Sequence, residues 1–237
     1  MNPDSPCVTA GIAQSRDRRN LQSPDQSPDT VIQARVCDAS RPCEHARMNF
    51  CSNCGQRVAL ATPPGDHLPR FVCASCGAIH YENPKIIAGC VPEYEGRILL
   101  CRRGIEPRLG FWTFPAGFME NGETVQQAAA RESREESLAE VEIGSLLAVV
   151  HVLSARQVHM FFRARLPLAS FGPTPESLEV GLFSEAEIPW GEIAFPSIEF
   201  ALRRYFQDRA AGREDHHFTS VERRPPGIPL QPGKTHV

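Results

Sequence analysis

The chain has 237 residues, of which 41% are hydrophobic and 22% are charged, and its formal net charge is −3. This composition is typical of a globular protein and excludes wholesale disorder. The chain has 25 Lys and Arg residues and 28 Asp and Glu residues, so it lacks the excess of positive charge that is typical of proteins that bind duplex nucleic acid or an anionic membrane. The longest nearly apolar run, Ile143 to Ala155, is shorter than the ~20 residues that cross a membrane. We therefore expect neither kind of partner.

The N-terminal region has a different composition from the rest of the chain. Residues 1–47 repeat Ser-Pro-Asp and contain few aromatic residues, so we expect a disordered leader and hypothesise that Met48 is the translation start. The chain begins without the basic and apolar stretches of a secretory signal, which predicts a cytoplasmic protein. Its nine cysteines are then metal ligands or buried thiols rather than disulfides.

A cysteine-paired module is predicted over residues 48–82. Two Cys-x-x-Cys pairs, each followed by glycine, are separated by 18 residues, the spacing of a four-thiolate zinc ribbon. The expected zinc ligands are Cys51, Cys54, Cys73 and Cys76. Four thiolates leave no open coordination position, so this zinc is expected to be structural. Two alternatives are unliganded cysteines in a small hairpin fold and a nucleic-acid-binding ribbon, although the module has few cations.

A larger mixed α/β domain is predicted over residues 83–211. Runs of apolar and β-branched residues between turn signals predict five strands. They cover residues 86–91, 97–103, 111–114, 146–153 and 158–165. Thr124 and Gln127 form a capping box that begins a helix ending near Ser137, and apolar residues at helical spacing predict a second helix around residues 198–206. Prolines beyond Gly212 suggest an extended tail over residues 212–237.

The first predicted helix concentrates negative charge on one face. Glu132, Glu135 and Glu136 stand at positions i, i+3 and i+4, where like charges destabilise a helix by a few tenths of a kcal/mol per pair. A bound divalent cation would reverse that repulsion, and hard oxygen ligands suit Mg²⁺ or Mn²⁺. This chemistry points to phosphoryl or nucleotidyl transfer. The alternative is a solvated surface helix with ordinary ion pairs.

The stretch upstream of these glutamates resembles a known signature. Gly117, five residues, Glu123, seven residues, Arg131-Glu132, two residues and Glu135-Glu136 is similar to the Nudix hydrolase box. The resemblance implies an α/β/α sandwich with a mixed sheet, here preceded by the small zinc ribbon. Two positions depart from the family pattern. Ser133 replaces an aliphatic residue, and Leu138 stands where a glycine normally ends the helix.

The resemblance also implies roles for individual residues. The three glutamates would bind Mg²⁺ or Mn²⁺, the carbonyl of Gly117 would add a ligand, and Arg131 would orient a carboxylate. Glu123 would support the geometry between loop and helix, or be a structural ion-pair partner. The general base is either a glutamate of the box or one on a later loop, where Glu176 and Glu179 are candidates.

The resemblance narrows to one subgroup. The zinc ribbon and the stretches at residues 81–85, 99–103, 111–117 and 175–183 look like the plant chloroplast FAD and ADP-ribose pyrophosphatases. This similarity implies that a dinucleotide-like small molecule is the substrate, with FAD cleaved to FMN and AMP or ADP-ribose cleaved to AMP and ribose 5-phosphate. The sequence is compatible with a homodimer without specifying an oligomeric state.

Substrate contacts and alternative functions remain open at this point. Arg102, Arg103 and Trp112 could contact phosphates or stack on a base; otherwise Trp112 is a core residue and the arginines are solvated. A related NAD(H) pyrophosphatase branch usually carries a Ser-Gln-Pro-Trp-Pro-Phe-Pro stretch that is absent here. A Nudix-like module that senses a nucleotide without cleaving it typically lacks a box glutamate, whereas every one is present in this chain.

Overall fold

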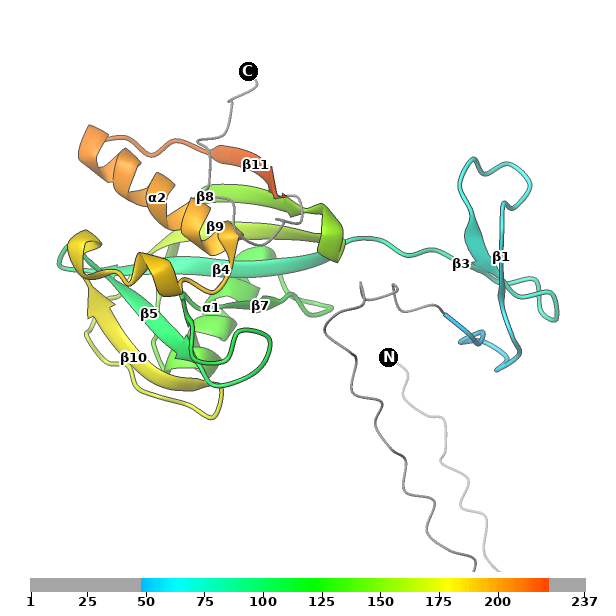
Figure 1. Ribbon diagram of the computed structural model, residues 1–237, viewed down its shortest axis with the longest axis horizontal. Helices are drawn as coiled ribbons and strands as arrows, with labels where there is room; N and C mark the ends of the chain where they lie inside the picture. Colours follow the sequence, from blue (N-terminus) through cyan, green and yellow to red (C-terminus); the bar gives the residue numbers. More distant parts are fainter. Residues whose placement is uncertain (1–47, 222–237) are drawn as a thin grey trace, which may run out of the picture.

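The computed structural model describes residues 48–221, and it contains a small three-stranded sheet followed by a large sheet with helices (Figure 1). The expected leader at residues 1–47 and the end of the expected tail at residues 222–237 lie outside the described residues. In the described part, no helix is both long enough and apolar enough to span a membrane.

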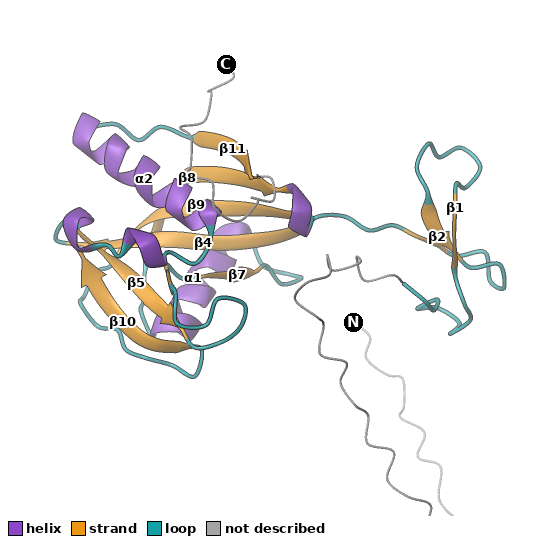
Figure 2. Cartoon of the chain, viewed as in Figure 1, coloured by secondary structure: helices purple, strands orange, loops and turns teal. Residues whose placement is uncertain are grey.

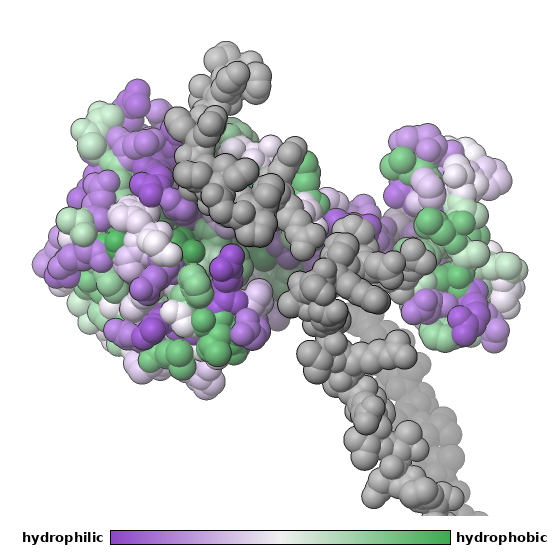
Figure 3. Space-filling view, in the orientation of Figure 1, coloured by the Kyte–Doolittle hydropathy of each residue, from purple (hydrophilic) through white to green (hydrophobic). Residues whose placement is uncertain are grey.

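The small sheet contains three short antiparallel strands in the order β1-β2-β3. The strands are β1 (Ala59–Ala61), β2 (Arg70–Val72) and β3 (Ile79–His80). Large hydrophobic side chains of this module, including Phe50, Leu60 and Leu68, are exposed, and apolar residues reach its surface in Figure 3. The module therefore buries too little apolar surface to be stabilised by a hydrophobic core alone.

The large sheet is mixed, in the order β10-β5-β4-β9-β8-β11 with β6 and β7 attached to β5 and β4. Its strands are β4 (Lys85–Tyr94), β5 (Arg97–Arg103), β6 (Trp112–Thr113), β7 (Ala116–Phe118), β8 (Glu142–Val152), β9 (Gln157–Arg165), β10 (Ser177–Phe183) and β11 (His217–Val221). The pairs β4–β9 and β8–β11 are parallel and the others are antiparallel. Each of the five predicted strands lies at least partly within one of these elements.

The two main helices cover opposite faces of this sheet (Figure 2). Helix α1 (Val125–Ser137) begins with the predicted Thr124 capping box and packs Ala128 and Ala129 against Cys90. Helix α2 (Pro196–Ala211) packs Leu202 and Phe206 into the core on the other face. Short 3-10 helices occur at Leu153–Ala155, Glu185–Glu187 and Trp190–Glu192. The predicted α/β/α sandwich is confirmed.

Two segments differ from their predicted conformations. Part of the expected tail forms β11, which pairs in parallel with β8 from His217 opposite Ala148 to Val221 opposite Val152. A buried Asp208 on α2 helps to fix this strand, because its carboxylate contacts both Arg163 and His217. The region that includes Glu179, which could have been a surface loop, is strand β10 paired with β5.

Candidate active site

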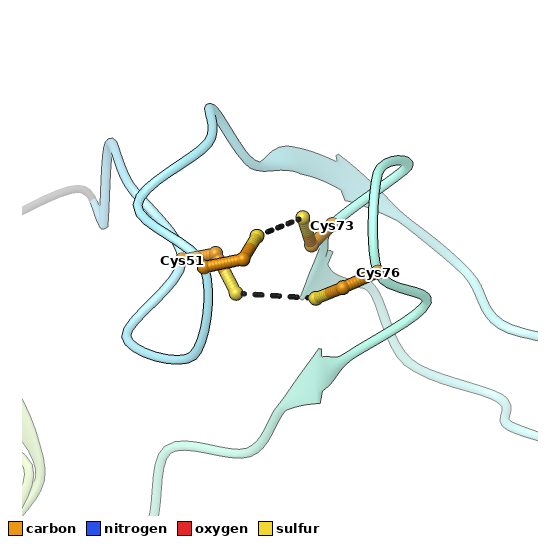
Figure 4. Close-up of side chains that lie close together, drawn as sticks. Cys51, Cys73 and Cys76 are labelled. Carbon is orange, nitrogen blue, oxygen red and sulfur yellow. Dashed lines mark hydrogen bonds between the residues drawn. The ribbon is translucent and has the colours of Figure 1, made fainter.

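The four predicted zinc ligands converge in the ribbon, with all their sulfur atoms within 4.8 Å of one another. The Sγ atoms of Cys51 and Cys76 are 3.6 Å apart, and those of Cys54 and Cys73 are 3.5 Å apart (Figure 4). A tetrahedral ion with Zn–S bonds of ~2.3 Å would separate its sulfurs by about 3.8 Å, so the donor set fits zinc closely. A hydrogen bond from the Cys76 amide lowers the pKa of the Cys73 thiol to about 7, which favours the thiolate.

Arg131 connects three of the box glutamates on helix α1 and the loop before it. Its Nη2 donates to Glu123 Oε1 at 2.8 Å and to the Phe118 carbonyl at 3.0 Å. Its Nη1 donates to Glu132 Oε1 at 2.8 Å and to Glu135 Oε2 at 2.9 Å. One guanidinium thus fixes the positions of three carboxylates and offsets part of their repulsion.

The carboxylate of Glu132 lies directly against the backbone of strand β7. A Cβ atom at Gly117 would come within 2.4 Å of both Glu132 oxygens, so a side chain at that position is incompatible with this arrangement. Burial raises the pKa of Glu132, while Arg131 opposes the shift. The absence of a side chain at Gly117 therefore allows the Glu132 carboxylate to lie against the β7 backbone.

Glu136, like Glu132, is buried, with only 8% of its surface exposed. Burial raises its pKa to about 8, and repulsion from Glu132 and Glu176 adds to the effect. A hydrogen bond of 3.1 Å from the Ala116 amide and the positive charge of Arg103 partly oppose it. A buried carboxylate facing other carboxylates has the charge environment that a divalent cation would stabilise.

The two candidate metal sites differ in how closely their potential ligand atoms approach. Within residues 48–221, only the four cysteines form a group of at least three ligand atoms all lying within 4.8 Å of one another. The glutamate oxygens of α1 are spread more widely, and Arg131 bridges Glu132 and Glu135. The fit of Mg²⁺ or Mn²⁺ therefore rests on the charge and chemistry of the donors.

The two candidate general bases have different surroundings. Glu176 lies in the turn before β10, where its carbonyl accepts a 2.7 Å hydrogen bond from the Gly104 amide. The Glu176 amide donates to Thr174 Oγ1 at 3.2 Å, and this hydroxyl lies 3.4 Å from the Glu136 carbonyl, so the turn lies against the end of α1. The negative charge of Glu176 adds to the rise in the pKa of both Glu132 and Glu136. Glu179 instead places its carboxylate 3.5 Å from Nη1 of Arg102 on the neighbouring strand.

The three residues considered for substrate contact also lie in different environments. Arg102 is exposed, whereas Arg103 is partly buried and places its guanidinium 5.2 Å from the ring centroid of Phe195. The positive charge of Arg103 also opposes the rise in the pKa of Glu136. Trp112 is only 7% exposed and packs edge-on against Phe183 in the core, which leaves it unsuited to stack on a base.

The two departures from the family pattern have local explanations. Ser133 is fully buried, and its Oγ donates to the Ala129 carbonyl at 3.0 Å and lies 3.2 Å from Cys90 Sγ. Its hydroxyl is therefore satisfied in a space where an aliphatic residue would pack. Leu138 ends the helix in the left-handed conformation, with φ of 57°, and its amide donates to the Arg134 carbonyl at 2.9 Å.

Sequence reasoning missed the groups that contact Glu136 from outside its helix. The Ala116 amide donates to its carboxylate, and Thr174 Oγ1 lies 3.4 Å from its carbonyl. The first is a backbone group, which has no signature in the side-chain pattern. The second comes from a loop 38 residues later in the chain.

Comparison with known families matches both parts of the chain. A zinc-ribbon model described as Nudix N-terminal matches residues 49–82, and the NUDIX domain model matches residues 84–208, more than half of the chain. The chain belongs to the Nudix family. Nudix enzymes are hydrolases that use divalent metals, and the sandwich and box described above are the corresponding features of this Nudix chain.

Individual relatives support this assignment. A crystal structure of a NUDIX hydrolase from Nitrosomonas europaea shares 52% identity with a TM-score of 0.72, covering 74% of this chain and 100% of that one. NAD-capped RNA hydrolase NudC of Photobacterium profundum is 31% identical over 144 residues, covering 60% of this chain and 52% of the relative. ADP-ribose pyrophosphatase of Methanocaldococcus jannaschii is 38% identical over 69 residues, covering 29% and 41%. The Nudix chain thus spans about half the length of the curated relatives it matches.

Proposed function

We propose that this Nudix chain hydrolyses the pyrophosphate bond of a small molecule linked to a nucleoside diphosphate, in a reaction that depends on Mg²⁺ or Mn²⁺. The observation that carries the proposal is the arrangement on α1. Arg131 fixes Glu132 and Glu135 beside a buried Glu136 whose pKa is raised to about 8. A site that accumulates buried negative charge in this way is suited to cations that in turn bind a diphosphate.

Each residue is proposed to contribute through the contacts described above. Glu132, Glu135 and Glu136 would hold the ions, together with the carbonyl of Gly117. When bound, the ions neutralise the diphosphate and acidify water. Arg131 keeps the carboxylates in place, and Glu123 in turn accepts two hydrogen bonds from Arg131.

Glu176 is the preferred general base of this proposal. Its turn reaches the end of α1 through Thr174, and its charge acts on Glu132 and Glu136, so Glu176 is proposed to take a proton from the water that attacks phosphorus. Glu179 is less favoured because its carboxylate is paired with Arg102 on the neighbouring strand. Arg103, whose charge reaches Glu136, is proposed to contact a phosphate of the substrate.

The substrate class is a molecule with an ADP moiety. Resemblance to the chloroplast subgroup favours FAD or ADP-ribose, and the relative named ADP-ribose pyrophosphatase agrees with the second. NAD(H) is equally supported, because several relatives are named NAD-capped RNA hydrolase. Those relatives are named for a capped RNA substrate, and the net charge of −3 argues only against binding of duplex nucleic acid.

A panel of substrates tests the proposal. The purified protein would be incubated with FAD, ADP-ribose, NADH, CoA and nucleoside triphosphates, with Mg²⁺ or Mn²⁺, and the products separated by chromatography. We expect AMP from at least one ADP-linked compound. Binding without any cleavage would instead support a nucleotide sensor and contradict catalysis.

A matched pair of variants tests the site itself. Glu136→Gln should lower kcat by roughly 100-fold or more, because it removes a charged metal ligand while keeping the shape of the side chain. Glu140→Gln removes a carboxylate that is exposed and paired with Arg134, so its activity should match the wild type. Full activity of Glu136→Gln would rule out this site.

A further inference from the structure

The zinc ribbon is built from two turns with the same hydrogen bonds. In the first, the Cys51 amide donates to the Gln56 carbonyl at 2.7 Å and the Gly55 amide donates to the Cys51 carbonyl at 2.9 Å. In the second, the Cys73 amide donates to Ala78 and the Gly77 amide donates back to Cys73, both at 2.9 Å. Both glycines are left-handed, with φ of 72° and 73°.

This repetition is broken seven residues after the first cysteine of each turn. Val58 occupies that position in the first turn, and His80 occupies it in the second. His80 lies on β3, where its backbone pairs with Phe71, and its Nε2 atom is 3.3 Å from the Sγ atom of Cys51. A histidine of the second turn therefore contacts a zinc ligand of the first.

The sulfur that His80 contacts is one of the two that water cannot readily reach. Cys51 is 3% exposed and Cys73 is fully buried, whereas Cys54 and Cys76 are exposed. The backbone amides of Ser75 and Cys76 donate to Cys73. A buried thiolate without solvent needs hydrogen-bond donors from the protein, because an unsatisfied buried charge is costly.

We propose that His80 is an outer-sphere residue of the zinc site, donating its Nε2–H to the Cys51 thiolate. Four thiolates around one zinc ion carry a net negative charge, and a donor to one of them reduces that charge and orients the ligand. Because four sulfurs already complete a tetrahedral set, His80 acts on a ligand and does not bind the metal. The proposal concerns retention of zinc and does not depend on hydrolysis.

Zinc release from the intact protein tests this proposal. Zinc content of the wild type is measured first, and transfer of zinc to a chromogenic chelator is then followed under native conditions. His80→Phe keeps the bulk of the ring without the donor and should release zinc about 10-fold faster. His80→Gln can still donate from a side-chain amide and should remain close to the wild type. His67→Phe is the matched control, because the His67 side chain is 88% exposed in the same module.

Specific results would contradict the proposal. Equal release from His80→Phe and the wild type would exclude the hydrogen bond, and equally fast release from His80→Phe and His80→Gln would indicate packing alone.

Absorption spectra of the cobalt-substituted wild type and His80→Gln provide a test that does not require His80→Phe to fold. We expect four sulfur ligands in both, with the thiolate-to-metal bands at similar energies because the glutamine amide still donates to Cys51. A nitrogen ligand in the cobalt-substituted wild type would overturn the proposal. So would the absence of zinc from the purified wild type, and that result would leave the hydrolase proposal unaffected.

Discussion

The ribbon and helix α1 both present clustered metal-ligand chemistry, but they are stabilised in different ways. The ribbon has very short strands and exposed apolar side chains, and its four sulfurs lie close together. Helix α1 is packed into a sandwich, and a protein cation, Arg131, balances its carboxylates. In the ribbon a metal would be part of the fold. On α1 a metal would be a ligand of a fold that is already complete.

Removal of zinc should distinguish the ribbon from the α1 region most clearly. A structural zinc contributes on the order of 10 kcal/mol to a small domain, so stripping it with a chelator should unfold the ribbon. Hydrogen exchange should show that the amides of Gly55 and Gly77 lose protection while those of β4 and β9 keep theirs. Protection of the ribbon amides after complete zinc removal would show that the module folds without the metal.

The pH dependence of the unfolding free energy should reveal the cost of ionising the buried Glu136 on α1. The folded-state pKa of Glu136 is raised from 4.5 to about 8, so the folded state binds a proton that the unfolded state releases between these values. In metal-free protein, this group should lower the unfolding free energy by up to about 1.4 kcal/mol per pH unit as the pH rises through that window. Glu132, whose pKa is also raised, should add to the decrease.

Chemical denaturation at several pH values measures this effect. Glu136→Gln should flatten the profile of the metal-free protein, because glutamine cannot ionise. Addition of Mg²⁺ or Mn²⁺ near pH 8 should restore stability to the wild type but much less to the variant. Identical profiles for the two proteins would show that Glu136 does not carry the buried charge.

The role of Arg131 can be separated from that of an ordinary surface arginine. Arg131→Met leaves Glu123, Glu132 and Glu135 without their shared cation and should lower the unfolding free energy by about 1–3 kcal/mol. Arg134→Met on the same helix removes only an exposed pair with Glu140 and should cost less than about 1 kcal/mol. Equal denaturation midpoints for the two variants would contradict the special role of Arg131.

The smallest expected effect concerns the ends of the two helices. Leu138 is exposed in a left-handed conformation, so Leu138→Gly should stabilise the protein by up to about 1 kcal/mol. Gly212 ends α2 with φ of 62°, and Gly212→Ala should destabilise the protein by a similar amount. Thermal unfolding of both variants measures the difference, and shifts of the same sign would be inconsistent with these cap conformations.

Features encoded over short sequence distances were predictable from the chain. The capping box of Thr124 and Gln127 is such a case, as is the convergence of the two cysteine pairs. Each depends on residues whose relative positions are set by one turn or by a repeated motif. The family signature places the glutamates on one helix for the same reason, since i, i+3 and i+4 positions share a face in any α-helix.

Features that depend on strand pairing were not predictable. The approach of Ala116 to Glu136 depends on the register between β7 and β4, and the position of Glu176 depends on the pairing of β10 with β5. The burial of Trp112 follows from its pairing with Arg102 on the neighbouring strand and from its contact with Phe183, which lies much later in the chain. A local pattern contains no information about which strands become neighbours.

Strand β11 has a practical consequence for shortened forms of this protein. It follows the segment matched by the family model, which ends at residue 208, so a truncation designed from that boundary would remove it. Strand β8 would then become an open edge with a row of unpaired backbone groups. Arg163 would lose the Asp215 carbonyl, and Asp208 would lose His217. Such a truncated protein should self-associate through that edge, whereas one ending after Val221 should remain dispersed.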